Sequence, residues 1–162
     1  MFDLPAERLA GSAGHWAFYR WRNVGINVWR KQATAAAATE ACDLAVQVRD
    51  ENPRGYSLVH LALPKAGLPD GEARSVFARR LADHVDRVYS VGILVEEQGF
   101  AASALRSAIT GILFLGPRNF PTFVKSTLEE LCDRLVDEHR RHHDSVDPAA
   151  LFQALSAARH GE

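Results

Sequence analysis

Two apolar runs separated by a segment of helical periodicity constrain the fold of this chain more than any other feature. The runs are YSLVHLAL at residues 56–63 and RVYSVGILVEE at residues 87–97. A strand that is apolar on both faces belongs inside a sheet that helices cover on both sides. Parallel neighbours also need a crossover of a dozen or more residues, and the helical segment between the runs supplies one. The pattern therefore predicts an α/β protein.

The flanking segments complete the predicted order of elements. Val24, Ile26 and Val28 alternate with other residues in an aromatic, β-branched region, which predicts a hairpin of two strands. Later segments alternate between helical periodicity and short apolar runs. The predicted order is β-β-α-β-α-β-α-β-α, a mixed and mostly parallel sheet with helices packed on it. We expect a flexible lead-in at residues 1–14, one domain at residues 15–145 and a C-terminal tail helix at residues 146–162.

Local capping signals mark where the helices begin. Thr34 and Asp70 each precede a helical pattern and can accept a hydrogen bond from its first turn. Ser126 and Thr127 each stand three residues before a glutamate, so two capping-box registers are equally good. The sequence leaves both registers open.

Composition places the chain among soluble globular domains. It has 162 residues, 47% of them hydrophobic and 24% charged, with a formal net charge of −1. This balance gives no overall positive field to gather nucleic acid. No apolar run approaches the ~20 residues of a membrane span and no leader is apparent, so we expect a cytoplasmic protein without membrane insertion. Cys42 and Cys132 lie among apolar residues at helical spacing, which favours buried free thiols.

The segment VEEQGFAASALRSAITGILFLG at residues 95–116 predicts a helix with two different faces. Its apolar residues are expected to pack on the sheet, and its small and polar residues share the other side. Our hypothesis is that this polar face binds a protein partner or a second copy of the chain, because small side chains allow close approach. A plain solvent face is the alternative. The residues expected to pack on the sheet are Phe100, Ala104, Leu105, Ala108, Ile109 and Ile112, and the partner-binding candidates are Ser103, Arg106, Ser107, Thr110 and Gly111.

The turn before this helix does not favour a nucleotide or a catalytic site. It holds one glycine, Gly99, whereas phosphate-binding loops carry several, and the preceding Glu96 and Glu97 would repel an anion. The two glutamates lie where α/β sites usually collect, but adjacent strand residues point to opposite faces. No nucleophile motif occurs either. We therefore predict no catalytic residues and no cofactor, and the ligand-binding residues are unknown.

Two further clusters carry a functional and a structural interpretation. His139 and His143 stand four apart, which is a metal-ligand spacing on a helix, although histidines also suit a helix C-terminus beside arginines. The hairpin interleaves aromatic and basic residues, a pattern that can stack single-stranded bases. Core packing is the alternative and agrees better with the neutral charge. Its aromatic residues are Trp16, Phe18, Tyr19, Trp21 and Trp29.

Two segments carry a resemblance to a known family. They are GILVEEQGFAASALRSAITGILFL at residues 92–115 and FPTFVKSTLEELCDRLVD at residues 120–137. Together with the order of elements from about Trp16 to Asp137, they resemble the STAS domain of bacterial anti-sigma-factor antagonists, and more closely the small stand-alone STAS-like proteins. The resemblance implies a non-enzymatic, regulatory module that binds partner proteins and sometimes small molecules. The phosphoswitch serine motif of the family is absent around Ser75, so no regulated serine is carried over.

The sequence therefore predicts a cytoplasmic, STAS-like module that binds a protein partner or itself, with a homodimer as one form. Two alternatives stay open. The first is a carrier of a small ligand or lipid, with a pocket between the hairpin aromatics and the core helices. The second is an enzyme with a site at the strand ends near Glu96.

Overall fold

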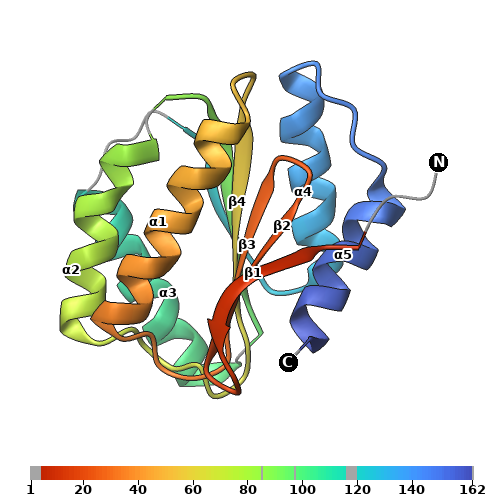
Figure 1. The fold of residues 1–162 in the computed structure, drawn as a ribbon. Helices are drawn as coiled ribbons and strands as arrows, with labels where there is room; N and C mark the ends of the chain where they lie inside the picture. The colour runs from red at the N-terminus through yellow and green to blue at the C-terminus, as the bar shows by residue number, and fades with distance from the viewer. Residues whose placement is uncertain (1–4, 85, 97, 116–119, 162) are drawn as a thin grey trace.

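The computed structural model describes residues 5–84, 86–96, 98–115 and 120–161. Within them a six-stranded sheet runs through the middle of the molecule, with the strands in chain order from one edge to the other (Figure 1). The strands are β1 (Glu7–Ser12), β2 (Trp16–Trp21), β3 (Val24–Trp29), β4 (Tyr56–Ala62), β5 (Val88–Val95) and β6 (Thr122–Lys125). The helices are α1 (Ala35–Glu51), α2 (Gly71–Arg80) with the short 3-10 turn η1 (Leu81–His84), α3 (Gly99–Leu115), α4 (Leu128–Arg141) and α5 (Pro148–His160).

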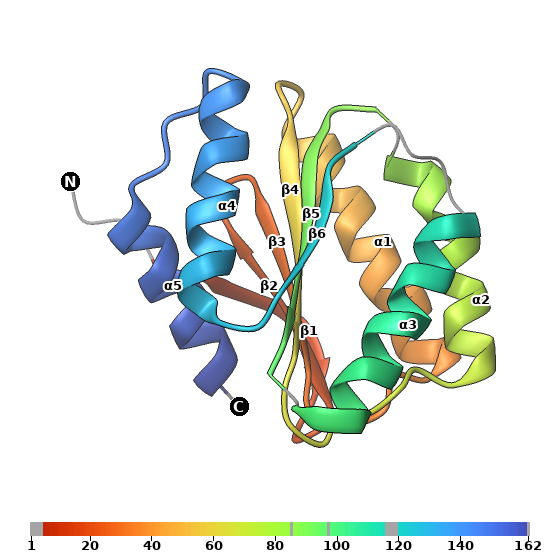
Figure 2. The ribbon, with the colours of Figure 1, turned by 180° about the vertical axis from the view of Figure 1, so that it is seen from behind.

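The sheet is mixed and mostly parallel, and helices cover both of its faces. Strands β1, β2 and β3 pair antiparallel, whereas β3, β4, β5 and β6 pair parallel. Helices α1, α2 and α3 lie on one face, and α4 and α5 lie on the other (Figures 1 and 2). This arrangement confirms the predicted α/β class.

The capping residues act largely as the sequence indicates. The side chains of Thr34 and Asp70 accept from the backbone N–H groups of the first turns of α1 and α2. Of the two registers left open before α4, the structure uses Thr127, whose hydroxyl accepts from the Glu130 N–H. Each cap satisfies one of the donors that a helix start leaves unpaired.

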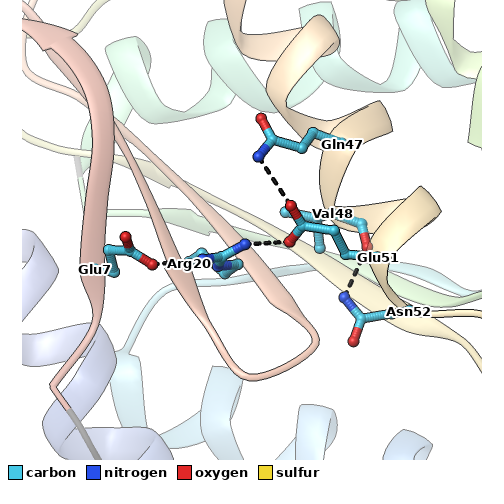
Figure 3. A network of polar contacts seen from close by, with 6 residues as sticks. All are labelled: Glu7, Arg20, Gln47, Val48, Glu51 and Asn52. Carbon is cyan, nitrogen blue, oxygen red and sulfur yellow. Dashed lines mark hydrogen bonds and ion pairs between the residues drawn. The ribbon is translucent and has the colours of Figure 1, made fainter.

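The expectation of a flexible lead-in is wrong for residues 7–12, which form the edge strand β1. This strand pairs with β2 and is irregular between Arg8 and Ala10. Its residues are exposed or half-buried, so they show no apolar alternation from which a strand could be predicted. Figure 3 shows how Arg20 of β2 joins the edge to α1: its guanidinium donates to Glu7 at 2.6 Å and to Glu51. Glu51 also accepts from Gln47 at 2.9 Å.

The C-terminal helix α5 is part of the core. Its residues Leu151, Ala154, Leu155 and Ala158 are buried against the sheet. The Arg30 guanidinium donates to carbonyl oxygens in the last turn of α5, where unpaired carbonyls attract a cation.

The two faces of the sheet carry separate apolar clusters. Under α4 and α5 the core holds fully buried leucines, whereas under α1 to α3 it holds many alanines together with aromatic residues. Cys42 belongs to the cluster under α1 to α3 and Cys132 to the cluster under α4 and α5, and both are free thiols, as predicted. No helix among the described residues is long and apolar enough to cross a membrane.

Candidate functional site

An apolar pocket of about 120 Å³ lies between the sheet and helices α1, α2 and α3. We call it the α1–α3 pocket. Its walls come from the inner faces of β3, β4 and β5 and from all three helices, and one end reaches the loops that follow β3 and β4. It is lined by Asn27, Trp29, Lys31, Ala33, Ala41, Cys42, Ala45, Leu58, His60, Ala62, Ala66, Gly67, Pro69, Phe77, Arg80, Leu81, Val91, Ile93, Leu105, Ile109, Ile112 and Leu113.

The pocket exists because the inward stripe of α1 is made of small side chains. Ala41, Cys42 and Ala45 face the sheet across the pocket and are buried. Protein interiors are close-packed, so a helix that places alanine at successive core positions leaves space unless a bulky residue opposite fills it. Here the opposite wall includes His60 and Leu58, and they do not close the gap.

Aromatic rings form one side of the pocket. The Trp29 indole N–H donates to Nδ1 of His60 at 3.3 Å, which fixes both rings at the sheet surface. Phe77 of α2 meets Trp29 and His60 edge-on, with ring centroids 5.8 and 6.0 Å away. Trp16 stacks behind Trp29 at 5.8 Å. Because each ring is held by another, this wall is preorganised rather than formed on binding.

Asn27 places a buried amide group in a mainly apolar lining. Its side chain is on the same face of β3 as Trp29, and the residue is 1% exposed. Its Oδ1 atom has no hydrogen-bond partner among the residues that the structure describes. Buried polar groups in native proteins are nearly always paired, so an unpaired amide oxygen beside a cavity indicates a place for a donor.

Two basic residues and one thiol also line the pocket. Lys31 lies where β3 leads toward α1 and is exposed, while Arg80 lines the pocket from the end of α2. Arg80 is engaged by Asp43 at 2.8 Å and by Asp83. Burial raises the pKa of the Cys42 thiol to about 11, so at neutral pH it is a protonated, unreactive wall group.

The predicted partner-binding residues do share the outer side of α3. Ser103, Ser107, Thr110 and Gly111 are exposed. The Ser103 and Thr110 hydroxyls donate to carbonyls four residues back in their own helix, at 3.3 and 2.9 Å. Arg106 is half-buried, and its guanidinium donates to the Ser126 hydroxyl at 2.6 Å. The arginine is therefore anchored on the loop before α4 in this structure.

Phe100 does not pack on the sheet as expected, because its side chain is 90% exposed. It occupies the first turn of α3, and Gly99 before it has φ 71°, a left-handed value that favours glycine. Helical spacing puts Phe100 on the same side as Ser103 and Ser107, away from the buried Leu105 and Ile109. The expectation that Phe100 packs on the sheet is therefore wrong, because its helical spacing, and not its hydrophobicity, sets the face on which it lies.

The histidine pair does not have the geometry that its spacing suggests. Helix α4 ends at Arg141, and His143 lies beyond it with φ 56°, so the i, i+4 argument does not apply. His139 is fully buried, and its Nδ1 pairs with Asp144 at 2.9 Å. Burial is the main cause that lowers the pKa of His139. Among the described residues, no group of three or more metal-ligating side chains comes together.

Asp144 is the centre of a polar network at the end of the sheet where β4 and β5 begin. Besides His139, it accepts from Asn23 Nδ2 at 2.8 Å, and that amide also donates to the Gly55 carbonyl at 3.0 Å. Burial acts to raise the pKa of Asp144, but hydrogen bonds from Asn23 and His139 lower it overall. These bonds tie the β2–β3 turn to the loops after α1 and α4. We interpret the network as structural.

Two other candidate sites from the sequence were the aromatic hairpin, for nucleic acid, and the strand end near Glu96, for an enzyme. The aromatic residues of the hairpin (Trp16, Phe18, Tyr19, Trp21 and Trp29) are all buried, so they cannot stack nucleic acid bases. Glu96 is held by Arg159 of α5 at 2.8 Å. Glu97 lies outside the described residues.

No protein-family model matches this chain, and none of the curated proteins is significantly similar to it. The STAS-like resemblance therefore stays a prediction, and we infer the function from the geometry of the described residues.

Sequence reasoning missed the site residues of the pocket. The alternation of Val24, Ile26 and Val28 predicts a strand but gives no role to Asn27 between them, and the apolar run at residues 56–63 does not mark His60 as a site residue. The available signal was the coincidence of a small-residue helix stripe with polar residues at inward strand positions. That signal becomes specific only when the register places Asn27 directly beside His60.

Proposed function

We propose that this protein is a non-enzymatic binding module that holds a small, mainly apolar ligand in the α1–α3 pocket. The observation that carries the proposal is the apolar pocket itself, which is walled by a sheet and three helices. Asn27 lines it, and the buried Oδ1 of that residue has no partner among the described residues. An engineered cavity of roughly 150 Å³ in another protein binds benzene, so a pocket of this size suits one ring or a short branched chain. Of the functions that the sequence leaves open, the carrier of a small ligand is thus the hypothesis that the geometry supports best.

The test is to fill the pocket from α1 and measure the binding of simple aromatic probes. Tryptophan fluorescence is a suitable signal, because Trp29 lines the pocket. Toluene and 4-methylphenol are expected to bind the wild type, and Ala45→Phe is expected to abolish binding by occupying the space. Ala36→Phe is the matched control, because Ala36 is exposed on the same helix. Absence of probe binding, or equal binding by Ala45→Phe and the wild type, would contradict the proposal.

A second candidate function, binding of a protein partner through α3, is favoured by a separate observation. Phe100 and Phe114 are 90% and 70% exposed at opposite ends of the helix. Between them, Ser103, Ser107 and Gly111 follow at helical spacing and are exposed as well. An exposed stripe of small side chains between two aromatic rings suits close docking of another surface. We call it the α3 outer stripe.

Association through the α3 outer stripe is tested by introducing bulk at its centre. Ser107→Arg is expected to abolish self-association in light scattering, or capture of a partner in a pull-down. Thr39→Arg, at an exposed position of α1, is the control. Unchanged association in Ser107→Arg would argue against the stripe.

A further inference from the structure

The unpaired oxygen of Asn27 narrows the class of ligand that the α1–α3 pocket can take. Three buried side-chain atoms lack a partner in the described part of the chain: Tyr19 Oη, Asn27 Oδ1 and His139 Nε2. Only Asn27 among these residues lines this pocket. A carbonyl oxygen accepts and never donates, so what satisfies it must bring an O–H or an N–H.

We propose that the ligand is a small aromatic acid whose ring carries a hydrogen-bond donor, a hydroxyl or a ring N–H. This inference depends on the proposed function, because it names the ligand of the same pocket. The donor meets Asn27 Oδ1 inside the pocket, the ring lies along the aromatic wall, and the carboxylate faces Lys31.

The ring is indicated by the shape and chemistry of the wall. Trp29 and His60 lie side by side on the sheet, and Phe77 meets both edge-on. A planar ring gains from offset or edge contacts with such a wall in addition to its buried area. A volume of about 120 Å³ accommodates one ring and leaves little space for a long acyl chain. A fatty acid would also bring no donor to Asn27.

The acid is indicated by the charges of the lining. Lys31 and Arg80 are the charged groups among the described lining residues, so no carboxylate there opposes an anion. Arg80 already pairs with Asp43 and Asp83, whereas no carboxylate within the described residues pairs with Lys31. The Lys31 ammonium at the loop end is therefore the group available to a ligand carboxylate.

The residues that meet the two polar ends of the ligand come from one short segment of the chain. Asn27 and Trp29 stand two apart on β3, so their side chains point to the same side of the sheet. Lys31 lies two residues beyond the end of β3, and all three residues line the pocket.

The experiment compares three probes that differ by one group each: 4-hydroxyphenylacetate, phenylacetate and 4-hydroxyphenylacetamide. Dissociation constants are measured by calorimetry for the wild type, Asn27→Leu and Lys31→Met. The wild type is expected to favour the hydroxylated acid over phenylacetate by about tenfold, as one hydrogen bond to a buried group provides. It is expected to favour the acid over the amide by roughly two- to fivefold, as an exposed ion pair provides.

The variants separate the two polar contacts. Asn27→Leu should remove the preference for the hydroxyl and keep the preference for the acid, while Lys31→Met should do the reverse. Lys125→Met, a lysine that does not line the pocket, is the control and should change neither preference. The wild-type comparison alone tests the donor even where Asn27→Leu fails to fold.

The outcomes distinguish this inference from the proposed function. Equal binding of 4-hydroxyphenylacetate and phenylacetate by the wild type would overturn the donor assignment, although toluene and 4-methylphenol still bind. Equal binding of the acid and the amide would overturn the role of Lys31. Failure of toluene and 4-methylphenol to bind as well would instead remove the proposed function.

Discussion

The two faces of the sheet are covered by helices that share the spacing of their first four buried positions but carry different side chains there. Helix α1 buries Ala38, Ala41, Cys42, Ala45 and Val48, and helix α4 buries Leu128, Leu131, Cys132, Leu135 and Val136 among others. Both stripes repeat at three and four residues, and both include a cysteine. The α4 stripe fills its face with leucines, whereas the alanines of α1 leave the α1–α3 pocket. Side-chain size at equivalent positions thus decides which face can receive a ligand.

Both faces of the sheet hold buried polar atoms without a partner among the described residues. On the α4–α5 side these are Tyr19 Oη and His139 Nε2. The buried Glu138 carboxylate on that side, by contrast, accepts from Arg134 at 2.7 Å and from Arg141 at 3.0 Å. On the α1–α3 side the unpaired atom is Asn27 Oδ1. Asn27 differs from the other two residues because it also lines the α1–α3 pocket.

The largest expected effect comes from truncating leucine on each face. Leu135→Ala should lower the free energy of unfolding by about 2–5 kcal/mol, because Leu135 is fully buried in α4 and its loss creates a cavity. Leu113→Ala should have a smaller effect, because Leu113 is only half-buried beside space that already exists. Urea unfolding of both variants checks the difference. Equal losses would show that the α1–α3 face is as tightly packed as the other.

Enlarging an alanine on each face tests the same contrast from the opposite direction. Ala154→Leu in α5 should destabilise the protein by about 1–3 kcal/mol, because Ala154 is buried and the added atoms must displace its packed neighbours. Ala45→Leu should change stability by less, since its added atoms enter the pocket. Thermal and urea unfolding give both values. A loss of stability in Ala45→Leu as large as that in Ala154→Leu would contradict the presence of free space on the α1–α3 face.

The pH dependence of stability should depend on His139, on the α4 side. Its pKa is lowered in the folded protein, mainly by burial and further by Arg22 and His142, although Asp144 acts to raise it. The unfolded chain then takes up a proton first, so the free energy of unfolding should fall as pH drops below the ordinary value of about 6.5. His139→Leu should flatten this part of the curve.

The control for this prediction is His143→Asn, an exposed position with a left-handed backbone that asparagine tolerates. The control should leave the slope of the free energy of unfolding against pH unchanged between pH 7.5 and 5.5. Urea unfolding measures this slope for the control and for His139→Leu. Asp144 has a lowered pKa, so its contribution to the free energy of unfolding is present above about pH 3.8. That contribution is lost only at a pH more acidic than the window from 7.5 to 5.5. A slope that survives in His139→Leu would assign the titration to another group.

The smallest expected effect is at the surface network that joins β1 and β2 to α1. Arg20→Met should lower the free energy of unfolding by about 0.2–1 kcal/mol, because the ion pairs with Glu7 and Glu51 are partly exposed and screened by salt. Added salt should reduce the difference from the wild type. A larger, salt-independent loss would mean that packing of the Arg20 stem holds the edge strand.

Much of the fold could be predicted because it depends on local pattern. The apolar run YSLVHLAL became β4, the alternation of Val24, Ile26 and Val28 became β3, and Thr34 and Asp70 cap their helices. Strand β1 could not be predicted in this way, because an exposed edge strand needs only backbone pairing to its neighbour. The solvent-facing position of Phe100 likewise depends on where α3 meets the sheet.

The α/β class, the alternation of strands and helices, and the burial of both cysteines can all be predicted from the residues alone. These features follow from periodicity and composition, which act over a few residues. Only in the folded chain does the small stripe of α1 come to face Asn27 and the aromatic wall across an unfilled space. A cavity is the difference between the volumes that several distant elements supply and the space that they enclose, so no single segment encodes it.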